Sequence, residues 1–367
     1  MSIVLLCLVA GLAFANGSND NGKGVATLVG FGAARPWPAL LYATLATAVG
    51  GVVSFWLAGG LLAGFSTGLF AKGTALSNGF FACVLIGACG WVLFATRTGM
   101  PVSTTHAIIG ALCGAGLVAF GNSRMQWSFL GAKFAVPLAV SPVLSLAIVY
   151  LLAWPVVFMV QRIAGRCVCI VEQEPGLEAV AVGGAAVATP EQPRMAVVIN
   201  YESACAGAPG VTTSAAANAL HWLTCGLISF ARGWNDTPKI AALSLFALAA
   251  MPHGTAVGFA IVTVAMAVGG LLAGRRVLDT LARKLTPLPL AESLTASLTT
   301  AALVIVASKV ALPVSTTHVA TGSIIGAGLK NDPGNIKWGK VGEVVLSWVV
   351  TLPVAGLIAA AAKFVIR

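Results

Sequence analysis

Two identical runs of six residues each bring together three adjacent hydroxyl groups that could bind a ligand. Residues 101–106 and 313–318 both read Pro-Val-Ser-Thr-Thr-His, and each precedes an apolar stretch with regularly spaced glycines. A Ser or Thr after Pro is typical of a helix N-cap, and the free N–H groups and dipole of a first helical turn favour an oxyanion. We therefore predict an anion site, with simple capping as the alternative. Its ligands would be Ser103, Thr104, Thr105, Ser315, Thr316 and Thr317.

A second repeated pattern places a carboxylate inside apolar sequence. An Asn-Asp pair beside a glycine, three residues before a lysine, occurs as Asn19, Asp20 and Lys23 and again as Asn235, Asp236 and Lys239. An ionised carboxylate in a membrane needs a partner or water. Carboxylate and amide oxygens, with carbonyls freed by an unwound helix, are ligands for a small cation such as Na⁺. The pattern predicts a cation site at the two Asn-Asp pairs. The alternative is an Asp–Lys pair that braces a kink in each helix.

Five ionisable residues are candidates for accessory roles: Lys23 and Lys239 of the Asn-Asp pattern, His106, His318 and Glu292. His106 and His318 end the hydroxyl runs, where each could relay a proton or simply donate to a backbone carbonyl. Glu292 begins an apolar segment and is either interfacial or part of a cation path. The residue 212 positions before it is Phe80, so the repeat gives no support to Glu292.

The elements that position these groups come from a duplication. Each half holds about five hydrophobic segments, at 3–34, 37–64, 77–96, 103–120 and 128–160, and at 212–250, 253–274, 290–309, 315–330 and 340–362. Because five crossings is an odd number, the two halves would enter the membrane with opposite orientation, as in many secondary transporters. We predict an all-α polytopic membrane protein of two inverted repeats, with roughly 10–12 helices including broken helices and hairpins.

Composition supports the membrane assignment. Hydrophobic residues make up 58% of the chain, charged residues 9%, and the mean hydropathy is +0.94. Soluble domains carry about 25% charged residues. The net charge of +10 fits basic cytoplasmic loops better than a nucleic-acid partner. Residues 3–15 imitate a signal peptide, but no positive charge precedes them and the pattern recurs internally. We read them as part of a membrane helix.

We divide the chain into a first transmembrane repeat at 1–160, a polar linker at 161–211 and a second repeat at 212–367. The linker is expected to be partly disordered, without chemistry of its own. Arg162 and Arg166 at its start, with the basic loop at 275–284, favour a cytoplasmic linker and termini on the outside. The eight cysteines show no metal-ligand spacing and are given no role.

With these motifs the chain resembles the inorganic phosphate transporter (PiT) family, which also includes a sulfate permease branch. The resemblance covers nearly the whole chain outside 161–211. It implies an inverted-repeat helical bundle, often a dimer, and phosphate uptake coupled to Na⁺ or H⁺. It also implies that the Asn-Asp pairs shape the cation and substrate sites and that the Ser-Thr-Thr runs hold the anion. Glu292 resembles a glutamate upstream of the second run in relatives. Ser18, Trp234 and Arg232 depart from the common family pattern, which leaves ion identity and substrate choice open.

The predicted function is secondary-active import of inorganic phosphate by a multi-pass protein of the plasma (inner) membrane. A bound cation would reduce the cost of desolvating the anion. Sulfate is the nearest alternative, although a carboxylate acceptor favours hydrogen phosphate, which can donate a hydrogen bond. A passive anion channel fits the broken helices less well. We expect no enzyme, because the chain has no His-Glu-x-x-His or Gly-x-Ser-x-Gly motif. We expect no cofactor besides the coupling ion.

Overall fold

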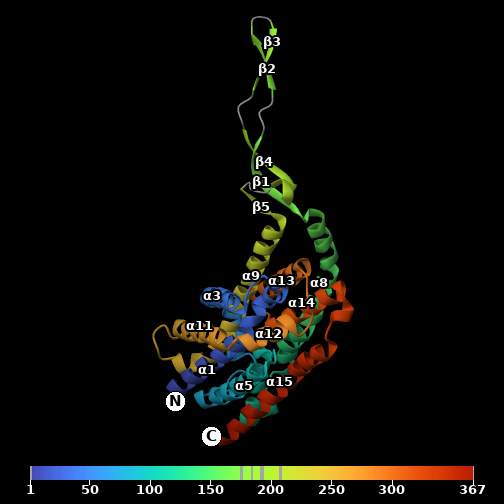
Figure 1. Ribbon diagram of the computed structural model, residues 1–367. Helices are drawn as coiled ribbons and strands as arrows, with labels where there is room; N and C mark the ends of the chain where they lie inside the picture. Colours follow the sequence, from blue (N-terminus) through green and yellow to red (C-terminus); the bar gives the residue numbers. More distant parts are fainter. Residues whose placement is uncertain (1, 174–176, 183–184, 191–193, 206–208, 367) are drawn as a thin grey trace. The chain divides into compact units, whose positions relative to one another are not determined.

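The computed structural model describes residues 2–173, 177–182, 185–190, 194–205 and 209–366 (Figure 1). The chain divides into two compact units. The first, which we call the helical unit, consists of Met1–Trp154 and His221–Arg367. The second, which we call the linker unit, is Pro155–Leu220.

The same order of helices occurs in both halves of the chain. The first half runs α1 (Ser2–Asp20), the 3₁₀ helix η1 (Asn21–Val25), α2 (Ala26–Phe31), α3 (Pro36–Leu57), α4 (Gly59–Ser66), α5 (Asn78–Thr98), α6 (Thr104–Phe120), η2 (Asn122–Arg124), α7 (Trp127–Leu130), the π-helical turn η3 (Gly131–Ala135) and α8 (Val136–Ile163). The second runs α9 (Thr213–Ala241), η5 (Ala242–Ser244), α10 (Leu245–Leu248), α11 (Gly254–Ala273), α12 (Arg275–Arg283), α13 (Leu290–Lys309), α14 (Thr316–Asn331), η6 (Pro333–Asn335) and α15 (Trp338–Val365). The five segments predicted for each half match these helices in order.

The two halves pack against each other through reciprocal glycine contacts. A Cβ on Gly17 of α1 would overlap the carbonyl of Met266 in α11, and a Cβ on Gly233 of α9 would overlap the carbonyl of Thr47 in α3. Small residues allow helices this close an approach in membranes. The exchange of equivalent contacts is expected of two-fold-related halves. Their opposite orientation across a bilayer remains a prediction.

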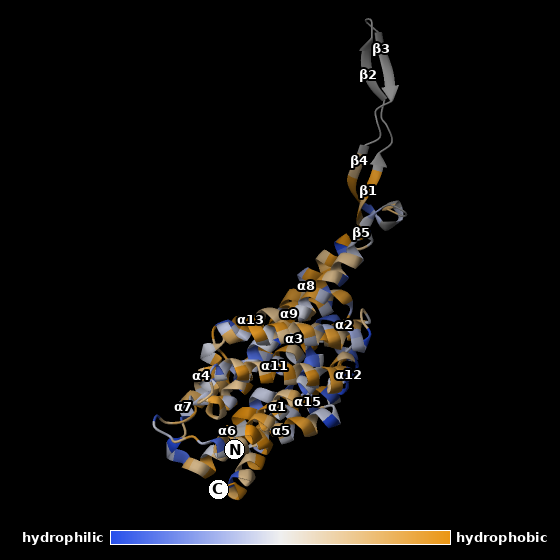
Figure 2. Cartoon of the chain, turned by 90° about the vertical axis from the view of Figure 1, so that its left-hand side faces the viewer, coloured by the Kyte–Doolittle hydropathy of each residue, from blue (hydrophilic) through white to orange (hydrophobic). Residues whose placement is uncertain are grey.

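Seven segments of the described chain are helical, long and apolar enough to cross a membrane (Figure 2). They are Ile3–Phe31, Pro36–Leu57, Asn78–Thr98, Trp127–Ile163, Gly254–Ala273, Leu290–Lys309 and Trp338–Val365. Helices α6 and α14 have only 17 and 16 residues, less than the 20 or so that a full crossing needs. They begin at the Ser-Thr-Thr runs, so each starts part-way through the apolar layer if its other end reaches the surface. The predicted membrane fold is confirmed.

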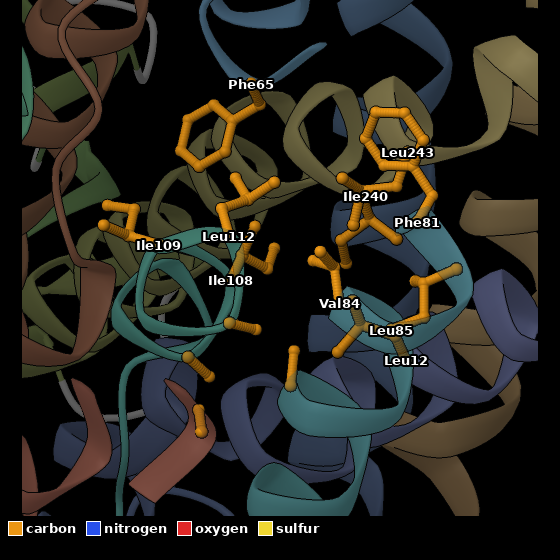
Figure 3. Close-up of a cluster of buried hydrophobic side chains, with 14 of the residues drawn as sticks. Leu12, Phe65, Phe81, Val84, Leu85, Ile108, Ile109, Leu112, Ile240 and Leu243 are labelled. Atoms are coloured by element: carbon orange, nitrogen blue, oxygen red, sulfur yellow. The ribbon is translucent and has the colours of Figure 1, made fainter. Parts of the chain in front are cut away.

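A large apolar core fixes α5 and α6 against the end of α9 (Figure 3). Phe81 of α5 and Ile108 of α6 are fully buried, together with Ile240, which directly follows Lys239 in α9. Leu12 of α1 joins the same cluster. Apolar contact with both halves therefore sets where the polar motifs at the ends of these helices lie.

The linker unit contains strands, where the sequence suggested a partly disordered segment. β1 (Arg166–Gln173) pairs antiparallel with β4 (Arg194–Tyr201) and β5 (Gly210–Thr212), and β2 (Leu177–Val182) pairs with β3 (Ala185–Pro190). The strands form because β-branched residues face one another across β1 and β4: Val168 lies opposite Ile199, and Ile170 lies opposite Val197. The overall composition of the linker does not reveal this pattern. Residues 174–176, 183–184, 191–193 and 206–208 of the predicted linker lie outside the described residues.

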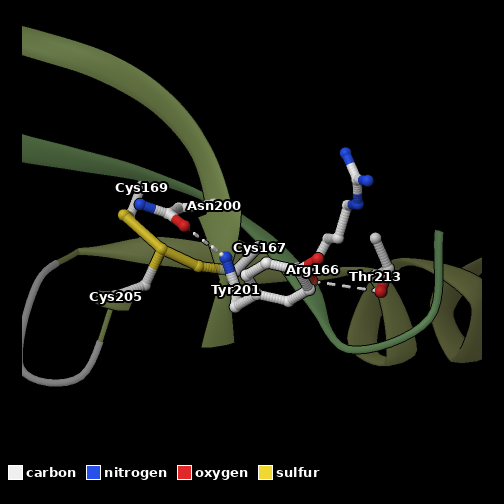
Figure 4. Close-up of a disulfide and its surroundings, with 7 residues drawn as sticks. All are labelled: Arg166, Cys167, Cys169, Asn200, Tyr201, Cys205 and Thr213. Carbon is white, nitrogen blue, oxygen red and sulfur yellow. Dashed lines mark hydrogen bonds between the residues drawn. A yellow bond between two sulfur atoms is a disulfide. The ribbon is translucent and has the colours of Figure 1, made fainter. Parts of the chain in front are cut away.

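Three cysteines of the linker unit lie together (Figure 4). Cys167 and Cys169 are two positions apart on β1, so both side chains lie on the same face of the strand. Each is within disulfide-bonding range of Cys205 in η4 (Glu202–Cys205). A single sulfur forms one disulfide at a time, so Cys205 could pair with only one of the two. We gave these residues no role from the sequence, because their spacing along the chain is not that of a metal site. Cys205 is 36 residues from Cys169, and only the folding of the chain brings the two together.

Candidate anion and cation site

Both Asn-Asp motifs lie where a long helix is interrupted. Helix α1 ends at Asp20 and continues as a 3₁₀ turn through Lys23, while α9 contains Pro238 between Asp236 and Lys239. A proline inside a helix removes one backbone hydrogen bond and bends the helix. The two carboxylates and the two lysines are all at most 4% exposed. Buried charges of this kind require close partners.

The Ser-Thr-Thr runs form the N-termini of α6 and α14, as predicted. The Ser103 hydroxyl accepts a hydrogen bond from the N–H of His106 at 3.2 Å, and the Ser315 hydroxyl accepts one from His318 at 3.3 Å. The two N-termini lie close together, because the Thr317 hydroxyl donates to the Val102 carbonyl at 2.8 Å. Two positive ends of helix dipoles therefore meet at one place.

Each lysine ammonium is held by three oxygens of different kinds. Lys23 Nζ donates to an Asp20 carboxylate oxygen, to the Val102 carbonyl at 2.7 Å and to the Thr317 hydroxyl. The second copy repeats this arrangement: Lys239 Nζ donates to Asp236 Oδ1 at 3.2 Å, to the Val314 carbonyl at 3.0 Å and to the Thr105 hydroxyl at 2.8 Å. In both sets the carboxylate and the carbonyl come from the lysine's own half, and the hydroxyl comes from the other half.

Asn19 and Asn235 fasten the chain just before each helix N-terminus. Asn19 Oδ1 accepts from the Val102 N–H at 3.1 Å, and its amide donates to the Met100 carbonyl at 3.0 Å. The Asn235 amide donates to the Val314 carbonyl at 3.0 Å, and its Oδ1 accepts from Ser308 at 3.3 Å. These bonds place the asparagines as positioning groups for the Ser-Thr-Thr runs.

Two central residues were not assigned to the site from the sequence: Asn16 was given no role, and Arg232 was noted only as a departure from the family pattern. The Asn16 amide donates to Asp20 Oδ2 at 2.9 Å and lies 3.4 Å from Asp236 Oδ2, so one side chain bridges the carboxylates of both halves. Arg232 donates to Asn16 Oδ1 at 3.1 Å and to Asn21 Oδ1 at 3.2 Å. Asn16 precedes Asp20 by four residues, and Arg232 precedes Asp236 by four. That i,i+4 spacing on one helix face was the available signal.

The cluster carries a surplus of positive charge. Two buried carboxylates, Asp20 and Asp236, face three buried cations, Lys23, Lys239 and Arg232. Each lysine is paired with its aspartate. Arg232 has no carboxylate hydrogen-bonded to it within the described chain, and its Nε has no hydrogen-bond partner there. The surplus charge is therefore that of Arg232, beside the two facing helix N-termini.

The second hydroxyl of each run differs from its neighbours. Thr104 donates to Asp20 Oδ2 at 3.3 Å and accepts from the Asn16 amide at 3.0 Å. Thr316 is 4% exposed, and its side chain makes no hydrogen bond to another described residue. Of the six predicted hydroxyl ligands, two cap helices, two hold lysines and Thr104 joins the carboxylates. Thr316 is the one left free within the described chain.

The side chains of His106, His318 and Glu292 make no hydrogen bond to the aspartates or lysines of this cluster within the described chain. The rings of His106 and His318 are 4.6 Å apart between centroids, and His318 Nδ1 lies 3.1 Å from the Leu138 carbonyl. Both rings line a largely apolar cavity of about 720 Å³ between α6, α8, α14 and α15. Glu292 is buried in the first turn of α13, where the helix dipole favours a carboxylate.

Comparison with known proteins decides the family. The model of the phosphate transporter family matches residues 16–359, which include both Asn-Asp motifs and both Ser-Thr-Thr runs. The chain belongs to the phosphate transporter family. The family resemblance read from the motifs is therefore confirmed, and the matched range contains the residues of the buried charge cluster.

Relatives within the family match along almost the whole chain. A protein of Mycobacterium bovis named a probable low-affinity inorganic phosphate transporter is 28% identical, over 98% of this chain and 76% of its own length. One of Bacillus subtilis with the same name is 26% identical, over 100% and 96%. A putative phosphate permease of Pyrococcus horikoshii is 29% identical, over 97% and 95%.

A solved structure confirms the fold. The protein described as the sodium-dependent phosphate transporter superposes with a TM-score of 0.75, covering 99% of this chain and 98% of its own, at 21% identity. The chain is thus an integral membrane protein of this fold, and its two Asn-Asp motifs and two Ser-Thr-Thr runs meet at one buried site.

Proposed function

We propose that this chain is a secondary-active symporter that imports inorganic phosphate together with Na⁺ or H⁺. The observation that carries the proposal is the buried cluster in which Arg232 adds an unbalanced positive charge beside two facing helix N-termini. An oxyanion entering this place gains charge-assisted hydrogen bonds and loses less on desolvation than it would in an apolar site. The names of the relatives, all phosphate transporters or permeases, agree with this substrate.

Alternating access would arise from rocking of the two halves. Lys23 and Lys239 are each held by oxygens of both halves, so a relative movement would break and remake these bonds at the substrate site. The reciprocal glycine contacts lie at the interface between the halves, where packed helices can slide past one another by small shear movements. The carboxylates of Asp20 and Asp236 favour phosphate over sulfate, because hydrogen phosphate has a proton to donate to them.

The test is uptake of labelled phosphate into proteoliposomes that contain the purified protein. A Na⁺ gradient and a pH gradient are imposed separately, with excess sulfate as competitor. Accumulation against a gradient that sulfate leaves unchanged is the expected result. Uptake that sulfate suppresses would make the protein a sulfate permease. Equilibration without accumulation would make it a passive anion channel.

Thr316 offers a specific test of the anion site. In Thr316→Val we expect the phosphate KM to rise about tenfold, because one uncharged hydrogen bond to the anion, worth roughly 1.4 kcal/mol, is lost. Thr104→Val removes a hydroxyl already bonded to Asp20, so it should also lower the melting temperature. The measurement is the concentration dependence of uptake, with Thr98→Val, a substitution at the exposed end of α5, as the control. An unchanged KM in Thr316→Val would leave this residue a purely structural role.

The side of the membrane that holds the linker unit is also testable. We place it in the cytoplasm because of the basic residues at its start, Arg162 and Arg166. Cysteines of cytoplasmic segments are normally reduced. A variant without the native cysteines that carries Met195→Cys, at a position 70% exposed in the linker unit, should react with a membrane-impermeant maleimide only after the cells are permeabilised. Ile3→Cys in the same background, at a position 78% exposed near the N-terminus, should react in intact cells, since the termini are proposed to lie outside. The reverse pattern would invert the proposed topology.

A further inference from the structure

The two lysine cages have the composition of monovalent cation sites. Each cage offers one carboxylate oxygen, one main-chain carbonyl and one threonine hydroxyl, and these surround the Nζ atom of Lys23 or Lys239. Such hard oxygen ligands are those that alkali and alkaline-earth cations take in proteins. An ammonium has three donors, and in each cage all three are matched by an oxygen.

These cages are more than the Asp–Lys braces that the sequence allowed. A brace at i,i+3 requires bonds only within one helix, whereas each ammonium here also reaches a hydroxyl of the opposite half. Lys23 bonds Thr317, 294 residues away, and Lys239 bonds Thr105, 134 residues away. Both side chains are at most 3% exposed. The same arrangement built twice, across the interface of the halves, indicates a role in the transport cycle.

A second cation would meet strong repulsion in either cage. Two unit charges 4 Å apart at the effective dielectric of a protein repel enough to weaken binding by about a thousandfold. The carboxylate that would attract a sodium ion is already paired with the ammonium, 3.2 Å away in the second cage. A free Na⁺ would therefore gain little binding free energy from the carboxylate of either cage and would be repelled by the lysine ammonium.

We propose that Lys23 and Lys239 are resident cations, tethered ammonium groups that occupy the two cation positions, so that neither cage takes up Na⁺ and transport does not require it. The inference rests on the proposed function, because it concerns the ion that accompanies phosphate. It replaces our expectation of Na⁺ at the Asn-Asp pairs. The charge that helps to hold the anion is thus carried by the protein in every cycle.

The first test uses the wild-type protein and does not depend on transport. Its melting temperature in detergent is measured while NaCl replaces choline chloride at constant ionic strength. No saturable shift between 0 and about 100 mM is expected, since a ligand that binds the folded state stabilises it. A saturable shift would show a sodium site and overturn the proposal.

The second test creates a sodium site. Lys23→Asn and Lys239→Asn, singly and together, remove the ammonium and add an amide oxygen to each cage. We expect these variants to gain a sodium-dependent rise in melting temperature and at least a tenfold stimulation of phosphate uptake when Na⁺ replaces choline. The matched control is Lys309→Asn, at an exposed helix end, which should stay indifferent to Na⁺.

The outcomes separate this inference from the proposed function. Wild-type uptake that is equal in sodium and choline media supports resident cations, and uptake that falls more than tenfold without Na⁺ contradicts them. Folded Asn variants that remain indifferent to Na⁺ in both assays also contradict them. If the wild type takes up no phosphate in either medium, the proposed function fails, while the melting measurements still decide whether the cages bind Na⁺.

Discussion

Replacement of Asp20 or Asp236 by asparagine is expected to lower phosphate uptake to below about 1% of the wild-type rate. Each carboxylate neutralises one lysine and lies within hydrogen-bonding range of the Asn16 amide that connects the two halves. Removing one partner of a buried ion pair leaves an uncompensated charge, which costs about 3–5 kcal/mol. The measurement is uptake into proteoliposomes, normalised to the amount of protein inserted.

A loss of folding must be distinguished from a loss of transport in these variants. The double variant Asp20→Asn with Lys23→Met removes both charges of one pair, so it should recover most of the stability that Asp20→Asn loses while remaining inactive. Glu343→Gln, which removes the acidic member of an exposed ion pair on α15, should behave like the wild type. Wild-type uptake in both Asp variants would refute a transport role for the carboxylates.

Replacement of Arg232 by glutamine should weaken phosphate binding more than any change at a hydroxyl. Arg232 is the surplus cation of the cluster, is 1% exposed and donates to Asn16, Asn21 and Thr47. Removing a buried charge that faces an anion costs about 2–5 kcal/mol, so the phosphate KM should rise by roughly thirtyfold or more. The measurement is the concentration dependence of uptake at constant ionic strength.

The conservative variant separates charge from bracing. Arg232→Lys keeps the positive charge but loses the planar donor geometry, so its KM should lie closer to that of the wild type than the KM of Arg232→Gln. If Arg232 only braces its three polar neighbours, both variants would lower the melting temperature and leave the KM unchanged. That result would remove the surplus charge from the account of anion binding.

Much of this protein was determined by local sequence. Apolar segments of sufficient length predicted the membrane helices, and Ser after Pro predicted the N-termini of α6 and α14, because helix formation and capping depend on neighbouring residues. Exact recurrence of the motifs predicted the duplication. Their resemblance to the motifs of the PiT family predicted the family, which the family match confirms. The Asp and Lys residues of the buried cluster were all named from the sequence, because charged residues are rare inside its apolar segments.

Only the tertiary structure decided what each polar group contacts. Sequence reasoning gave all six hydroxyls one role, whereas Ser103 caps a helix, Thr105 holds Lys239 and Thr316 is free of side-chain bonds within the described chain. The bond from Lys23 to Thr317 joins residues 294 positions apart. No local pattern encodes such a pair, because it depends on how glycine contacts and the apolar core bring the two halves together. The sequence thus determines which polar groups are available at the site, and the packing of the two halves determines which group each of them contacts.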